Sequence, residues 1–206
     1  MRRSFPLLMT AAVLLLPACS DEPAASLVGV GRTPPLEVGS VSLPEVTNSD
    51  TGEPFPFAAA DGELLVVYFG FTSCPDLCPT TLADLRAARR RIGTDADVVD
   101  LAFVTVDPNR DTTEILRRYV GSFADRFHIL RTTDTAALEA AEDAFLASSS
   151  ITTLPDGEIS VSHTAATYVV DSSGTVLVEW PFGIGVSGME NDLRLLIEQL
   201  KETTNP

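Results

Sequence analysis

An apolar stretch that runs straight into a pair of cysteines limits the folds open to this chain. Residues 64–71 carry no charge, as in a strand that is buried on both faces of a sheet. An amphipathic pattern follows over residues 79–92, with a proline at the position where a first helical turn tolerates one. A buried strand followed by a helix is typical of α/β folds with a central sheet.

Strand and helix signals continue to alternate along the rest of the chain. Further strands are predicted over 98–106, 127–130, 167–170 and 175–180, the last two forming a hairpin around the turn 171–174. Further helices are predicted from a capping box at Asp111–Glu114 to Tyr119, over 134–147, and from a capping box at Ser187–Glu190 onward. In the last helix Leu193, Leu196, Ile197 and Leu200 should face inward. This order predicts a mixed sheet covered by helices on both faces, which is the thioredoxin-like layout.

The length of the chain limits the number of domains, and its net charge argues against one class of partner. The 206 residues suit one compact domain, and the formal net charge is −15. A protein that binds nucleic acid needs a basic face, so no nucleic-acid partner is expected.

The first residues have the pattern of an export signal. Arg2 and Arg3 precede 14 uncharged residues, 5–18, which is too short a stretch to span a bilayer. The following Leu16–Cys19 resembles a bacterial lipobox, where cleavage precedes a lipidated cysteine. We therefore expect a lipoprotein signal peptide over 1–18, with a plain secretory signal as the alternative.

The N-terminal pattern also predicts where the protein works. Residues 19–40 are rich in Pro, Gly, Ser and Ala and are expected to form a flexible tether. Residues 41–206 then form the domain. A lipid on Cys19 would hold that domain on the extracytoplasmic face of the cell membrane.

Cys74 and Cys78 stand where the first buried strand meets its helix. Ligands of open α/β sheets bind at the carboxyl ends of strands, and the start of a helix lowers thiol pKa values. A spacing of four residues brings both sulfurs to one side of a first helical turn. The pair could close a disulfide or share a soft metal ion. An inert structural disulfide is the alternative, although so short a loop gains little from closure.

The chain has only two histidines to complete such a site. His128 lies within a predicted strand among apolar residues and is interpreted as structural. His163 ends a polar loop just before the strand at 167, which should pack near the cysteines. From the residues alone, a ligand role and a structural role for His163 are equally open. Asp107 follows the second buried strand at the same sheet edge and could orient His163 or a partner's group. Its alternative is a turn residue before Pro108.

Three blocks of the chain resemble the Sco/SenC family of copper-binding, thioredoxin-fold proteins. They are Tyr68-Phe-Gly-Phe-Thr-x-Cys74-Pro-Asp-x-Cys78-Pro79, Val106-Asp107-Pro-x-Arg110-Asp111-Thr112, and His163-Thr164 followed by Tyr168 and Asp171. The resemblance implies that Cys74, Cys78 and His163 bind copper. It also implies delivery of copper to the dinuclear copper A centre of cytochrome c oxidase subunit II, or to another exported copper enzyme. A copper donor or a thiol reductant would be a further partner.

The donor chemistry agrees with that implication. Two thiolates and one imidazole form a soft, low-coordinate site suited to Cu(I), with Cu(II) left open, whereas a structural zinc site needs a fourth ligand. Metal binding should weaken at low pH and disappear when the Cys74–Cys78 disulfide forms. The alternative function is an extracytoplasmic thiol-disulfide reductase that keeps the copper-site cysteines of the oxidase reduced. That enzyme would need only the redox-active cysteine pair.

Overall fold

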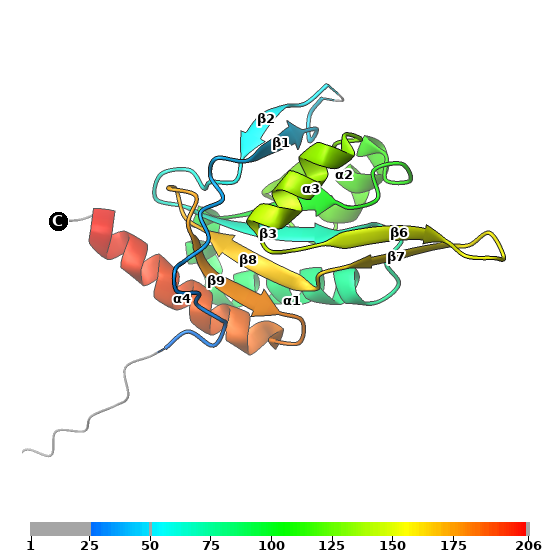
Figure 1. The fold of residues 1–206 in the computed structure, drawn as a ribbon. Coiled ribbons are helices and arrows are strands. Elements are labelled where there is room, and N and C mark those ends of the chain that lie inside the picture. Colours follow the sequence, from blue (N-terminus) through cyan, green and yellow to red (C-terminus); the bar gives the residue numbers. More distant parts are fainter. Residues whose placement is uncertain (1–25, 50, 205–206) are drawn as a thin grey trace, which may run out of the picture.

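A seven-stranded mixed sheet forms the centre of the computed structural model, which describes residues 26–49 and 51–204 (Figure 1). The strand order is β2-β1-β5-β4-β3-β8-β9. These strands span Ser42–Glu45 (β1), Glu53–Pro56 (β2), Leu64–Gly70 (β3), Val99–Thr105 (β4), Phe127–Leu130 (β5), Ala166–Val170 (β8) and Val176–Pro181 (β9). β3, β4 and β5 run parallel, and the other pairings are antiparallel. The predicted mixed sheet of a thioredoxin-like fold is confirmed.

Helices cover both faces of this sheet. They span Leu77–Ile92 (α1), Thr113–Gly121 (α2), Thr135–Ala144 (α3) and Gly185–Thr204 (α4), with a 3₁₀ helix at Gly93–Val98. α1 packs against α4 on one face, while α3 lies over the other (Figure 1). Because successive residues of a strand point to opposite faces, Phe69 of β3 meets Phe145 beyond α3, and Tyr68 faces α1.

The parallel register brings two loops to one edge of the sheet. Gly70 at the end of β3 pairs with Thr105 at the end of β4. The loop that leads to α1 and the loop that leads to α2 therefore begin side by side. Both cysteines and Asp107 belong to these loops or to the helix start that follows.

Both predicted capping boxes are wrong in detail. The N-cap of α2 is Thr112, whose hydroxyl accepts from the Ile115 N–H at 3.3 Å. Asp111 is instead fully buried and bonded to Thr72 and Thr105. α4 begins at Gly185, so Ser187 lies inside the helix. The apolar face predicted for α4 is confirmed, because Leu193, Leu196 and Ile197 are buried and Leu200 packs against the core.

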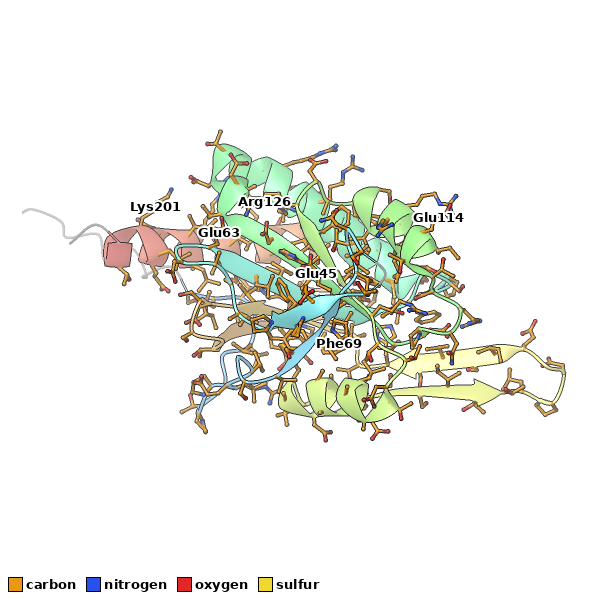
Figure 2. The ribbon with its side chains drawn as sticks, turned by 90° about the horizontal axis from the view of Figure 1, so that it is seen from above. Glu45, Glu63, Phe69, Glu114, Arg126 and Lys201 are labelled. Carbon is orange, nitrogen blue, oxygen red and sulfur yellow. The ribbon has the colours of Figure 1, made fainter. Side chains whose placement is uncertain are left out.

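A two-stranded ribbon replaces the polar loop expected before His163. It consists of β6 (Ser149–Thr153) and β7 (Ile159–His163), paired antiparallel as a separate sheet. The ribbon extends away from the rest of the domain in both overall views (Figures 1 and 2). Its polar residues are compatible with strands because most of this ribbon is exposed to solvent.

The folded part of the chain begins well before residue 41. From Ser26 to Gly39 the chain lies against the domain, whereas the sequence predicted a flexible tether over 19–40. Val30 bridges to Glu179 of β9, and Val38 is fully buried. Buried Asp192 of α4 accepts from the N–H groups of Val28 and Gly29, which explains why this segment is held. The predicted signal peptide and Cys19 lie outside the described residues. Within the described part, no helix is long and apolar enough to cross a membrane.

Candidate metal centre

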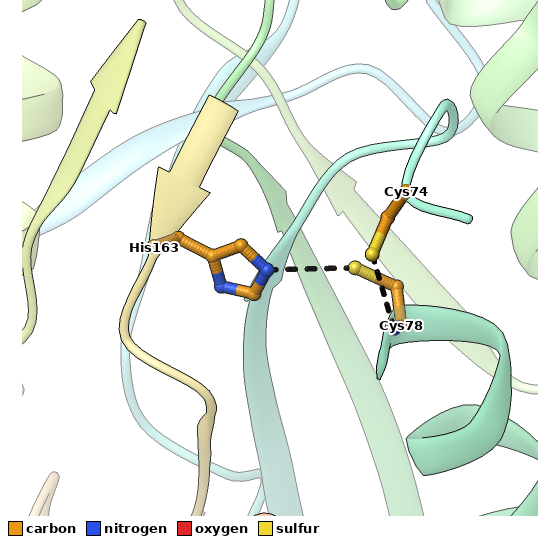
Figure 3. Close-up of side chains that lie close together, drawn as sticks. All are labelled: Cys74, Cys78 and His163. Atoms are coloured by element: carbon orange, nitrogen blue, oxygen red, sulfur yellow. Dashed lines mark hydrogen bonds between the residues drawn. The ribbon is translucent and has the colours of Figure 1, made fainter. Parts of the chain in front are cut away.

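The two cysteines lie on adjacent parts of the strand-to-helix junction. Cys74 lies in the loop after β3, where its N–H donates to the carbonyl of Phe71 at 3.3 Å. Cys78 occupies the first turn of α1, and its N–H donates to the sulfur of Cys74 at 3.3 Å (Figure 3). Both cysteines are free thiols in the structure, which is the state that metal binding requires. Their disulfide stays a prediction.

His163 reaches the cysteines from the ribbon. It is the last residue of β7, and its Nε2 lies 3.6 Å from the sulfur of Cys78 (Figure 3). Nδ1–H donates to the carbonyl oxygen of Thr164 at 3.0 Å, which leaves the Nε2 lone pair directed at the sulfurs. One donor atom each from Cys74, Cys78 and His163 lies within 4.8 Å of the other two. The structure therefore brings together all three residues that the sequence predicted as ligands.

Burial controls the protonation of this group. Burial lowers the pKa of His163, so the imidazole is neutral at neutral pH, as a ligand must be. Cys78 is fully buried, and burial raises the pKa of its thiol to about 12. Cys74 is 9% exposed. Cys78 is thus the more deeply enclosed of the two cysteines.

A buried carboxylate fixes the loop that carries Cys74. Asp111 accepts from the N–H of Thr72 at 3.1 Å and from its hydroxyl, and also from the hydroxyl of Thr105 at 2.7 Å. These bonds join the loop after β3 to the end of β4 and the start of α2. The sequence interpretation of Asp111 as a helix cap missed this role, because its partners are 39 and 6 residues away.

Asp107 does not contact His163 in the way the sequence allowed. Its carboxylate, only 2% exposed as a residue, pairs with the Nε–H of Arg110. The carbonyl of Thr164, rather than Asp107, orients the imidazole. A role of Asp107 toward a partner's group stays a prediction. His128 lies in β5 and bonds to Glu45 and Asp100, away from the three donors.

Aromatic side chains enclose the imidazole and the buried sulfur. Tyr68 and Phe71 meet the His163 ring edge-on, with ring centroids 6.1 and 5.8 Å away. Tyr68 also lies beside Cys78 and is 1% exposed. Its burial raises the pKa of the phenol, which therefore stays a protonated donor. In the sequence, Tyr68 stands out only as part of the motif that contains the cysteines, and no role for it follows from the motif.

The comparison with known families agrees with this arrangement. The family model described as SCO1/SenC matches residues 45–198. The chain belongs to the SCO1/SenC family. Among its relatives, an SCO2-like protein of Rickettsia typhi is 28% identical over 144 residues, 69% of this chain and 71% of that protein. The mitochondrial SCO2 homolog of Mus musculus is 31% identical over 69% of this chain and 57% of its own length.

Solved structures of SCO1/SenC relatives have the same fold. Apo Sco1 of Thermus thermophilus is 28% identical, with a TM-score of 0.70 over 84% of this chain and 99% of that one. ScoI of Bradyrhizobium japonicum, solved with copper bound, is also 28% identical, with a TM-score of 0.63 over 75% of this chain and 96% of that one.

Proposed function

We propose that this SCO1/SenC protein binds one copper ion through Cys74, Cys78 and His163 and delivers it to another exported protein. The observation that carries the proposal is the convergence of two sulfurs and one imidazole nitrogen within 4.8 Å. Soft thiolates together with imidazole favour Cu(I) among the common metals. Within the described residues, no acidic or further cysteine or histidine side chain joins this group, so the donor set does not fit a four-ligand structural zinc site.

Delivery follows from the same geometry. A three-donor site leaves room for an incoming ligand from an acceptor, and Cys74 is the less deeply buried of its two cysteines. Formation of the Cys74–Cys78 disulfide would remove two of the three donors, so the thiol state would decide whether copper is held. The copper-bound relative from Bradyrhizobium japonicum supports copper as the metal.

Our proposals for the copper acceptor and for the cellular location of the protein are supported by the amino-acid sequence. We propose the copper A centre of cytochrome c oxidase subunit II as the acceptor, with another exported copper enzyme as the alternative, on the resemblance to the Sco/SenC family. The pattern before Cys19 supports a lipid anchor on the extracytoplasmic face of the membrane.

The test is an anaerobic Cu(I) titration of the reduced chain beginning at Ser20, which retains every described residue, against a chromophoric chelator. We expect one copper per chain. His163→Ala should weaken binding by more than the roughly 10–100-fold that loss of a ligand's hydrogen-bond partner costs. Cys74→Ser combined with Cys78→Ser should abolish it. His128→Ala is the matched control, because His128 is the other histidine and its hydrogen-bond partners among the described residues are Glu45 and Asp100.

Absence of competitive Cu(I) binding by the fully reduced wild-type chain would refute the proposal. The reductase alternative has its own measurement, the rate of disulfide reduction by the reduced chain. His163→Ala should leave that rate unchanged while it impairs copper binding, because thiol exchange uses only the cysteine pair.

A further inference from the structure

We propose that Tyr68 is a positioning residue of this site, whose hydroxyl donates a hydrogen bond to the Cys78 sulfur when that sulfur holds copper. The inference rests on the proposed function and adds a residue to it. The observations that carry it are a buried hydroxyl without a partner and its position beside the enclosed sulfur.

The first observation concerns the hydroxyl itself. The Oη atom of Tyr68 is buried and has no partner in full hydrogen-bond geometry among the described residues, although the Cys78 sulfur and the Thr81 hydroxyl lie close enough to interact with it. Buried polar groups in folded proteins are almost always bonded, so an exception calls for an explanation. A phenylalanine would fill the same volume without this cost. A hydrogen bond that forms fully only when the site is loaded would supply that explanation.

The second observation concerns the neighbours of the hydroxyl, of which the Cys78 sulfur is the one that metal binding would charge. Tyr68 points from β3 toward α1, where the side chains of Cys78 and Thr81 lie beside it. Gly70 lies between the ring of Tyr68 and the sulfur of Cys78 and has no side chain to occupy the space there. A Cβ added at Gly70 would lie 2.8 Å from Cε1 of Tyr68 and 3.2 Å from the sulfur of Cys78. The absence of a side chain at Gly70 is what allows the ring and the sulfur to approach the same point.

The ring has little freedom to turn its hydroxyl elsewhere. Phe103 of β4 lies against one side of it, with ring centroids 6.0 Å apart, and the imidazole of His163 meets it edge-on. Tyr68 thus contacts one expected ligand and lies beside a second.

Metal binding would strengthen this contact. A neutral thiol is a weak acceptor, whereas a metal-bound thiolate carries negative charge and accepts strongly. The hydroxyl should therefore stabilise the loaded site more than the empty one. Together with the backbone hydrogen bond from Phe71, it would also fix the direction of the Cys78 sulfur.

Tyr68→Phe in the chain beginning at Ser20 tests this inference. We expect the Cu(I) affinity to fall about tenfold, the loss expected for one hydrogen bond to a charged group. A second readout uses Co(II) as a spectroscopic probe. The sulfur-to-Co(II) charge-transfer band should move to longer wavelength, because loss of the donor raises the electron density on sulfur. A general packing defect would not produce that shift.

Tyr119→Phe is the matched control. The Tyr119 hydroxyl is also buried without a partner, and its ring lies 6.0 Å from that of Phe103. Cys74 and Cys78 act on this phenol through charge but not through a hydrogen bond, so Tyr119→Phe should lose less Cu(I) affinity than Tyr68→Phe and leave the Co(II) band in place. An unchanged affinity and band in Tyr68→Phe would overturn the inference, and so would equal losses in both variants. Those results leave copper binding by the wild type intact, whereas a wild type without copper binding overturns the proposed function as well.

Discussion

At the scale of single residues, the two cysteines differ in what solvent can reach. Cys78 is fully enclosed by Tyr68, His163 and the first turn of α1, and burial raises the pKa of its thiol to about 12. Cys74 keeps 9% of its surface exposed and accepts the N–H of Cys78. Because Cys74 is the more exposed of the two, an incoming protein should meet Cys74 first. Thiolate, rather than thiol, is the reactive form of cysteine, so the raised pKa of Cys78 should also slow its reactions.

Alkylation rates measure this difference. With iodoacetamide at pH 8, we expect Cys74 of the reduced chain to react more than about tenfold faster than Cys78, because each unit of pKa above the pH reduces the thiolate about tenfold. Peptide mass spectrometry at successive times gives both rates. Cys74→Ser serves as the control, in which Cys78 should remain slow. Equal rates for the two cysteines would contradict the burial argument.

The sequence predicted the three donors but not the groups that support them. Spacing and strand position led to Cys74 and Cys78, and the resemblance to Sco/SenC proteins led to His163. Tyr68 and Thr164 could not be found in this way, because their roles depend on the orientation of one hydroxyl and one carbonyl. Asp107 was placed at the correct sheet edge, yet Arg110 takes its carboxylate. Proximity along a sheet edge does not fix the partner of a side chain.

At the scale of elements, Asp111 holds together the parts that position the site. It connects the loop after β3, the end of β4 and the start of α2. All of its donors lie in a buried or half-buried setting, where an unpaired group costs far more than an exposed one.

Asp111→Ala should lower the free energy of unfolding by about 3 kcal/mol, because buried donors on Thr72 and Thr105 lose their acceptor. Cu(I) affinity should fall as well, since the loop that carries Cys74 loosens. Asp134→Ala is the control. It removes only the N-cap of α3 and should cost about 1 kcal/mol without an effect on copper. Urea unfolding and the chelator titration measure both variants. A cost at Asp111 no greater than that at Asp134 would contradict its joining role.

Burial decided which elements the sequence could predict. β3 was predicted to within one residue because it is an apolar run, and β5 was predicted at its observed bounds because apolar residues flank His128. β6 and β7 were missed, since an exposed ribbon needs no apolar run and alternating serines are typical of loops too. β1 and β2 were missed for a similar reason, because both contain proline. α1 starts two residues before the predicted position, which places Cys78 inside the helix.

At the scale of the whole molecule, His128 of β5 connects β1, at one side of the sheet, to β4 at its centre. Its Nδ1 lies 2.8 Å from Glu45 of β1, and its Nε2 lies 3.4 Å from Asp100 of β4. Burial alone would lower the pKa of His128, but the hydrogen bonds to Asp100 and Glu45 outweigh it and raise the pKa. Two carboxylates on opposite sides of one ring favour the imidazolium, which donates to both.

The raised pKa sets the sign of a pH effect on stability. The contribution of His128 should be fully present below its ordinary pKa of 6.5 and lost as the pH rises through the raised value of the folded state. His128→Gln should therefore cost more stability at pH 5.5 than at pH 9 in urea unfolding. Asp100, whose pKa is lowered to about 2, contributes equally at both. A cost that is equal at the two pH values, or larger at pH 9, would contradict this linkage.

The attachment of the chain to α4 soon after the predicted signal peptide limits how far the domain could lie from a membrane anchor. The carbonyl of Ser26 accepts from the side chain of Asn191, so the chain is pinned to α4 from its first described residue. Under the proposed anchor at Cys19, only seven residues, 19–25, would separate the lipid from that point. A chain of that length spans at most about 25 Å. The domain would then stay close to the membrane surface. Lateral diffusion in the membrane would govern how often it meets an acceptor.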